Sequence, residues 1–177
     1  MQKCNSLTSY IFMINNKVKE LLKRESAFYN SVIHGIAHWK TVERNGHYLA
    51  KFNSADIKVI SYFSYFHDCM RENEGEDVKH GLRGAKFAEK SRNLIDLTDI
   101  QFKQLTDACK GHTYGKRPEC ITINTCWDAD RLDIGRVGIS PGAEFLFNEE
   151  AKRIAIQKDF AVLQGKIFYP SRKPPAL

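Results

Sequence analysis

IKVISYFSYFHD, residues 57–68, is the stretch on which the prediction of the fold depends. Read as a helix, it places Ile60, Phe63 and His67 on one stripe, at spacings i, i+3 and i+7. The stripe carries an imidazole, followed by the Asp68 carboxylate, into the core. A buried ionised carboxylate is costly unless a cation balances it. Imidazole and carboxylate are common metal ligands, so a metal site is one explanation, and a histidine ending a helix beside a solvated aspartate is the other.

Length and composition describe one ordinary globular domain over residues 1–177, with 42% hydrophobic and 27% charged residues. The net charge of +6 suits anionic ligands, but the basic residues are dispersed and not interleaved with aromatic ones, so nucleic-acid binding stays open without support. Five cysteines without a C-x-x-C, and no secretory signal or membrane span, lead us to expect a cytoplasmic protein. Oligomeric state is not readable from these patterns.

Helical periodicity runs along the whole chain, and no alternating strand pattern extends beyond a few residues. We therefore predict an all-α bundle of about six to seven helices. The expected helices cover residues 6–24, 31–50, 57–68, 78–94, 99–112, 121–134 and 143–163. Asp77 is expected to cap the helix that follows it, and Thr98 or Asp99 starts the next one. Residues 1–30 form a packing helix, and residues 164–177 form a loose tail.

Histidines and aspartates recur where these helices begin, end or face the core. Five of the six histidines do so: His34, His38, His67, His80 and His112. Asp130 interrupts the apolar stripe of the helix over 121–134, and a carboxylate there needs a cation or hydrogen bonds. We expect His47, which follows Asn45-Gly46, to be solvated. Several inward-facing histidines and carboxylates together favour a clustered metal site over scattered structural roles.

The order His, His-Asp, Asp resembles the HD superfamily of metal-dependent phosphohydrolases. Three segments carry the resemblance: HWKTV at 38–42, the doublet His67-Asp68, and DADRLD at 128–133. It spans about residues 31–140 and implies a helical bundle of the HD-domain type with that segment as its metal-binding core. Two departures are that Thr41 stands where many relatives carry Arg, and that His80 follows the doublet unusually closely.

The resemblance implies that His38, His67, Asp68 and Asp130 hold one divalent metal. Asp130 is preferred to Asp128 because it directly precedes Arg131-Leu132 and lies on the stripe. The other candidates are His80 and His112 for a second metal or phosphate, Arg83, Lys116, Arg117 and Arg131 for substrate, and His34 and Asp128 for orienting the ligands. The arginines and Lys116 are equally well explained as surface charges. Iron, manganese, nickel, zinc and magnesium stay open, although several histidines argue against a magnesium site built only from oxygen ligands.

The expected activity is hydrolysis of a small phosphorylated molecule, with nucleotides among the candidates, through a metal-activated water. Asp68 and His67 are the expected catalytic residues, with Asp68 able to take a proton from that water. Two alternatives differ in class. One is a di-iron oxygenase or other non-phosphate chemistry on the same scaffold, and the other is a regulatory module that binds ligand without turnover.

Overall fold

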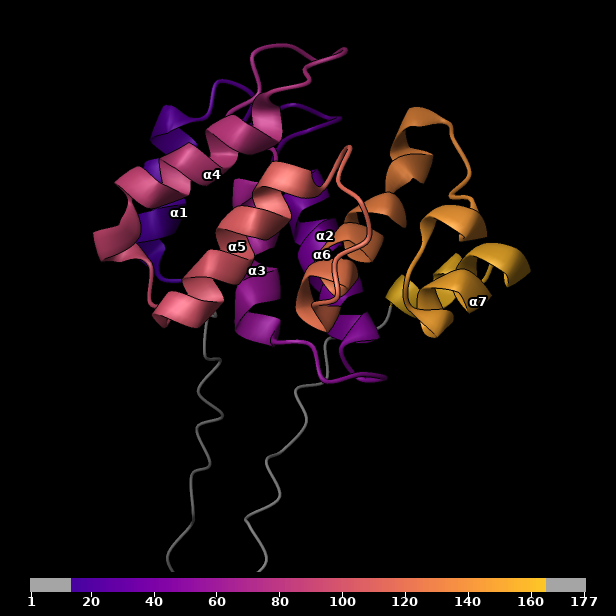
Figure 1. The fold of residues 1–177 in the computed structure, drawn as a ribbon. Helices are drawn as coiled ribbons and strands as arrows, with labels where there is room; N and C mark the ends of the chain where they lie inside the picture. The colour runs from indigo at the N-terminus through magenta and orange to yellow at the C-terminus, as the bar shows by residue number, and fades with distance from the viewer. Residues whose placement is uncertain (1–13, 165–177) are drawn as a thin grey trace, which may run out of the picture.

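A computed structural model describes residues 14–164, and this range contains seven α-helices, four short 3-10 helices and no strand (Figure 1). The all-helical prediction is therefore confirmed. The α-helices are α1 (Asn16–Glu25), α2 (Ile36–Leu49), α3 (Ile57–Phe66), α4 (His80–Lys90), α5 (Asp99–Gly111), α6 (Ile121–Arg131) and α7 (Glu149–Gln157). The 3-10 helices are η1 (Arg92–Leu94), η2 (Ile134–Val137), η3 (Ala143–Phe145) and η4 (Phe160–Gln164).

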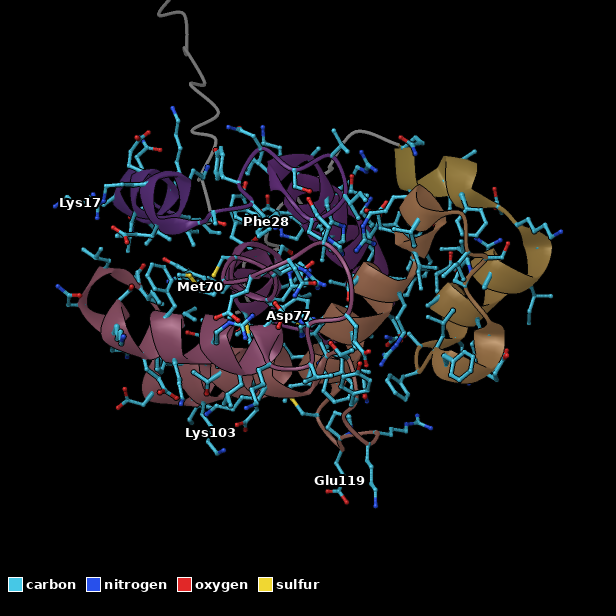
Figure 2. All side chains as sticks on the ribbon, turned by 90° about the horizontal axis from the view of Figure 1, so that it is seen from above. Lys17, Phe28, Met70, Asp77, Lys103 and Glu119 are labelled. Atoms are coloured by element: carbon cyan, nitrogen blue, oxygen red, sulfur yellow. The ribbon has the colours of Figure 1, made fainter. Side chains whose placement is uncertain are left out.

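Helix α3 is the centre of the bundle, with α2, α4, α5 and α6 packed around it (Figures 1 and 2). The Asp56 carboxylate starts the helix by accepting the backbone N–H groups of Lys58 and Val59 at 2.9 and 3.3 Å. Every residue from Val59 to Phe66 is buried. Each large apolar side chain among them contributes about 1.5–3 kcal/mol through burial. The C-terminal end of α3 therefore lies inside the protein, as does the His67-Asp68 doublet that follows it.

Helix α4 approaches the end of α3 unusually closely because its inner face carries glycine. A Cβ atom on Gly84 would lie 2.2 Å from the carbonyl oxygen of Phe66, and one on Gly81 would lie 2.2 Å from that of Cys109 in α5. No side chain fits in either place. The two glycines thereby bring His80, the first residue of α4, against α3 and α5.

The ends of two predicted helices differ from expectation. Helix α1 begins at Asn16, where the Asn15 side chain accepts the Val18 N–H at 3.0 Å, and the earlier part of the predicted helix lies outside the described residues. Helix α2 begins only at Ile36, so His34 lies ahead of it. The Ser31 hydroxyl accepts the His34 N–H at 2.9 Å and holds this residue in a turn instead.

The single helix predicted over 143–163 is wrong, because the chain there forms η3, α7 and η4. Asp128 of α6 accepts the backbone N–H groups of Phe147 and Asn148 at 2.7–3.0 Å, which turns the chain between η3 and α7. Lys158 then ends α7 in the left-handed conformation, with φ of 55°. The predicted tail over 164–177 lies outside the described residues apart from Gln164, which ends η4.

Asp77 does not cap α4, and the helix predicted over 78–94 is shorter than expected. The Asp77 carboxylate instead contacts the Arg83 guanidinium and accepts the backbone N–H of Glu72 at 2.9 Å. It therefore braces the loop before α4. The prediction for Thr98 is confirmed, since its side chain and that of Gln101 form a reciprocal capping box at the start of α5.

His47 is buried in the interface between α2 and α3, so the expectation that it is solvated is wrong. The His47 Nε2 atom lies 2.7 Å from the Ser61 hydroxyl oxygen, and His47 is only 5% exposed. Burial disfavours the charged imidazole and lowers its pKa to about 4. The unfolded chain, in which histidine titrates near 6.5, therefore binds this proton at a higher pH than the folded protein does.

We expect acid to destabilise the protein through His47. As pH falls from about 6.5 to about 4, the unfolded state takes up a proton that the folded state excludes, so the folded state loses about 2 kcal/mol by pH 5 relative to pH 7.5. Urea unfolding of the metal-free protein at both pH values, compared with His47→Gln, measures this. The variant should lose about 2 kcal/mol less than the wild type. An equal loss in both proteins would show that His47 does not cause it.

Candidate metal centre

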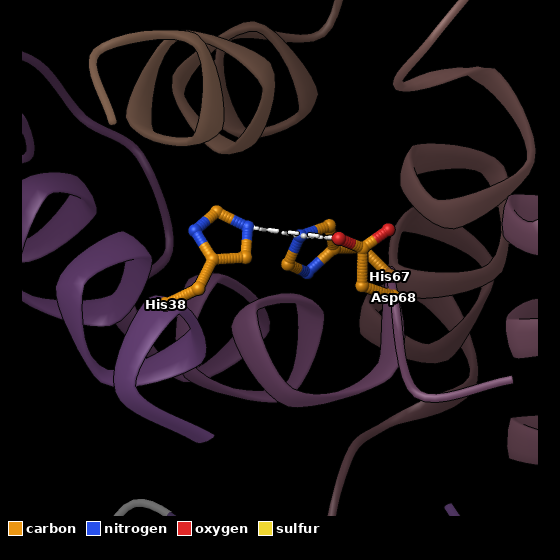
Figure 3. Close-up of side chains that lie close together, drawn as sticks. All are labelled: His38, His67 and Asp68. Atoms are coloured by element: carbon orange, nitrogen blue, oxygen red, sulfur yellow. Dashed lines mark hydrogen bonds and ion pairs between the residues drawn. The ribbon is translucent and has the colours of Figure 1, made fainter. Parts of the chain in front are cut away.

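Four side chains, from α2, α6 and the end of α3, lie close to one another. His38 of α2 and His67, which ends α3, bring their Nε2 atoms to 3.1 Å from each other. The Asp68 Oδ2 atom lies 3.7 and 3.6 Å from these nitrogens, and Asp130 Oδ1 of α6 lies 3.3 and 3.7 Å from them. Figure 3 shows His38, His67 and Asp68 pointing toward one another. The structure thus brings together all four residues predicted for the first metal.

A second group adjoins the first and shares Asp68 with it. The Nε2 atoms of His80 and His112 lie 2.8 Å apart. Asp68 Oδ1 is 3.2 Å from the first of these nitrogens and 3.7 Å from the second. One carboxylate therefore presents Oδ2 to the pair His38/His67 and Oδ1 to the pair His80/His112. The two histidines predicted for a second metal or for phosphate thus lie together beside Asp68, in a group that could hold an ion.

The opposite ring nitrogen, Nδ1, of each histidine is held by an acceptor outside this group. The acceptors are Ser64 O for His67 (3.0 Å), Cys109 O for His112 (2.8 Å), Asp77 O for His80 and the Asp133 carboxylate for His38 (2.7 Å). A carbonyl oxygen only accepts, so Nδ1 carries the hydrogen in the three rings that face one. A neutral ring then has its lone pair on Nε2, directed into the site.

Such lone pairs require a cation between them. Two neutral imidazoles repel when their Nε2 atoms face each other at 3.1 or 2.8 Å. Burial lowers the pKa of His67 to about 3 and also lowers that of His80. Hydrogen bonds to carboxylates outweigh burial in His38 and His112 and raise their pKa. Each pair therefore attracts one positive charge, either a proton or a metal ion.

The donor set fits a divalent metal. With metal–ligand bonds of about 2.0–2.2 Å, neighbouring ligand atoms lie about 3.0–3.5 Å apart, close to the 3.1–3.7 Å found around His38 and His67. Burial alone would raise the pKa of Asp68 and Asp130, but the surrounding histidines outweigh it and hold both carboxyls well below their usual range. Both are thus anionic ligands at neutral pH. Mixed nitrogen and oxygen donors suit transition metals better than magnesium.

The site opens to solvent on its Asp130 side. The Asp130 side chain is 17% exposed, whereas those of His38 and His67 are fully buried. Asp133, behind His38, is 20% exposed. Solvent therefore reaches the group at its two carboxylates from α6 and the turn after it, and not at the two histidines.

Arg71 is a buried cation that the sequence analysis did not single out. Its Nη1 lies 3.4 Å from Asp68 Oδ1, and its other nitrogens donate to the carbonyl oxygens of Asn73 and Gly75 at 3.2 and 2.7 Å. In the same loop, the Glu74 Oε2 atom lies 2.6 Å from His34 Nδ1. The loop over 71–77 is thus fastened beside the metal site. The His34 ring pairs with this loop, and among the described residues no hydrogen bond joins it to His38, His67, Asp68 or Asp130.

The structure gives Arg83 and Arg131 different surroundings. Arg83 Nε donates to Met70 O at 2.8 Å, and its guanidinium also contacts Asp77, so it is engaged in holding the loop. Arg131 stands over the Trp127 ring, with its guanidinium carbon 5.6 Å from the ring centre, and donates to His112 O at 3.2 Å. Its Nη1 is buried without a hydrogen-bond partner. Arg131 is therefore better placed than Arg83 to take a ligand oxygen.

Lys116 and Arg117 lie in the exposed loop between α5 and α6. The Arg117 guanidinium carbon lies 5.6 Å from the centre of the Phe147 ring. Within the part of the chain that the structure describes, no contact joins either residue to a metal-ligand histidine. Their predicted role as substrate contacts gains no support from this arrangement.

Asp133, and not Asp128, is the aspartate that contacts a histidine of the site. Asp128, predicted to orient a ligand, bonds to the segment before α7, with Asn148 Nδ2 donating to it at 2.7 Å. Asp133, which no prediction used, orients His38. It follows Asp130 by three residues where α6 ends, and this spacing places both carboxylates on one side. That spacing was the signal available in the sequence.

We expect Asp133→Asn to weaken metal binding without removing a ligand. The carboxylate fixes the His38 ring and increases its basicity, and loss of such a partner typically costs 10–100-fold in affinity. Competition with a chromogenic chelator measures the change in the metal dissociation constant. Asp159→Asn serves as the control, because this half-buried carboxylate pairs with Arg153 and contacts none of the four histidines in the described part of the chain. An unchanged constant in Asp133→Asn would contradict the orienting role.

Comparison with known proteins gives one structural match. No protein-family model matches the chain, and no curated protein matches its sequence. A solved structure, described as a predicted HD superfamily hydrolase from an uncultured Thermotogales bacterium, is similar with a TM-score of 0.64. The two are 22% identical, and the match covers 84% of this chain and 86% of that chain. The HD-type helical fold predicted from the sequence is thereby confirmed.

None of the helices in residues 14–164 is long and apolar enough to cross a membrane.

Proposed function

We propose that the protein is a metal-dependent phosphohydrolase acting on a small phosphorylated molecule. The observation that carries the proposal is the Asp68 carboxylate, which lies between two histidine pairs whose Nε2 atoms all face it. Such a site can bind two divalent ions side by side. The fold shared with a predicted HD superfamily hydrolase supports the same conclusion.

A divalent metal bound here would lower the pKa of a water molecule and polarise a phosphoryl oxygen. The residues supply position and charge for this chemistry. Asp68 and Asp130, both anionic at neutral pH, would offset the charge of the ions, and Asp130 is the ligand candidate most exposed to solvent. Of the two roles predicted for Asp68, metal ligand and proton acceptor, its lowered pKa favours the first. Arg131 Nη1, which is buried and has no hydrogen-bond partner among the described residues, is the proposed donor to a phosphoryl oxygen.

The test is phosphate release by the purified protein. Protein loaded with manganese, nickel or iron is mixed with a panel of nucleotides and simple phosphoesters, and released phosphate is measured against the chelated protein. We expect release that requires metal. An oxygen-dependent spectrum from bound iron without phosphate release would favour the oxygenase alternative. Tight binding of a panel member without product would favour a regulatory module.

A further inference from the structure

A cavity of about 240 Å³ lies on the Nδ1 side of His38, where Asp133 forms part of its wall. Helix α2 lines it with Thr41, Arg44 and Asn45. The segment after α6 adds Arg136 and Ser140, and η4 closes the far side. The four ligand histidines do not line it, so this cavity is distinct from the metal site.

Two polar groups in the cavity wall have no hydrogen-bond partner. Asn45 is 1% exposed, and its Nδ2 donates to Ala129 O at 3.1 Å, which leaves its Oδ1 buried and unpartnered. Arg44 Nε is buried in the same way. No hydrogen bond or ion pair engages the Arg44 guanidinium among the residues described. Buried groups of this kind cost about 1–3 kcal/mol each unless a ligand or water satisfies them.

The charges in the wall leave one cation unmatched. Arg136 donates to Ile33 O and Asp133 O at 2.8 and 3.1 Å, and its Nη1 lies 4.0 Å from the Asp133 carboxylate. Asp133 in turn pairs with His38. Arg44 is therefore the cation without an acidic partner, and it calls for an anionic group with oxygen acceptors.

We propose that this cavity is a second ligand site, which binds a small organic anion. The carboxylate or phosphate of the ligand pairs with Arg44, and a hydroxyl or amino group on the same molecule donates to Asn45 Oδ1. The volume suits a ligand smaller than a nucleotide, since drug-sized pockets begin at about 300 Å³. The site requires no metal, so the proposal stands independently of the proposed function.

The test uses glycerate and glycerol 3-phosphate, which carry hydroxyl groups beside a carboxylate and a phosphate respectively. Each is titrated by calorimetry into the full-length protein treated with a chelator, and the side-chain amide of Asn45 is followed by NMR. We expect saturable binding of at least one probe and a shift of the Asn45 signal. Arg44→Gln should weaken binding about tenfold or more, because a charged hydrogen bond is lost.

Three further variants separate the explanations. Ser140→Phe, in an exposed loop, should fill the cavity and abolish binding even if Arg44→Gln folds poorly. The Arg24 side chain is 69% exposed, so Arg24→Gln should bind the probe like the wild type. Asp68→Asn should also bind normally, and loss of binding there would assign the probe to the metal site. That result, or no binding of either probe to the wild type, would overturn the proposal.

Discussion

Replacing Asp68 with alanine is expected to abolish metal loading and, with it, phosphate release. The carboxylate contacts both histidine pairs, so its removal deletes a ligand from each ion position at once. It also removes the carboxylate that lies 3.4 Å from the buried Arg71 guanidinium. Loss of a residue that only hydrogen-bonds to a metal ligand typically costs about 10–100-fold in metal affinity. Loss of the shared ligand itself should therefore cost more than 100-fold.

Metal content by elemental analysis and chelator competition measure the effect. Asp96→Ala is the matched control, because that carboxylate is 86% exposed and pairs with Lys58 on the surface. His80→Ala adds a finer comparison, since it should empty the second position and leave His38 and His67 able to hold one ion. Full metal content in Asp68→Ala would contradict both the geometry and the proposed function.

Replacing Gly84 with alanine is expected to destabilise the protein by at least about 3 kcal/mol, the upper end of the usual cost of overpacking. The added Cβ would lie 2.2 Å from Phe66 O and 3.3 Å from His67 O. Both neighbours are backbone atoms at the end of α3, which cannot rotate away as a side chain can. Because alanine favours helix by about 1 kcal/mol over glycine, any loss of stability has to come from this contact.

Gly135→Ala is the control, because nothing lies within 4 Å of the place its Cβ would take. Chemical unfolding of both variants measures the difference, and Gly135→Ala should stay within about 0.5 kcal/mol of the wild type. Since α4 carries His80 to the site, Gly84→Ala should also lose metal affinity. A Gly84→Ala variant as stable as the wild type would contradict the close approach of α4 to α3.

Local signals predicted most of the fold. The apolar run over 57–66 and the Thr98 cap of α5 act through neighbouring residues, and both appear where the sequence placed them. The interruption between η3 and α7 depends on Asp128, about twenty residues earlier, which accepts the N–H groups of Phe147 and Asn148. A pattern read along the chain contains no signal for such a contact.

The same distinction applies to the site. His67 and Asp130 stood out because a polar group on an apolar stripe is visible in the periodicity itself. Arg71 did not, because an arginine in a polar loop is normally solvated, and only the folded chain shows it buried against Asp68. His47 was misjudged for the converse reason, since Asn45 and Gly46 beside it are typical of turns but here lie within α2.

The four histidine rings of the site differ in whether a side chain or the backbone fixes their orientation. His67, His80 and His112 are oriented by backbone carbonyl oxygens, which every amino acid carries, so no replacement of the neighbouring side chain deletes the acceptor. Only His38 depends on a side chain for this. In homologous sequences, substitution of Asp133 would change the orientation of the His38 ring. The other three rings would keep their orientation when the residues that hold them are substituted.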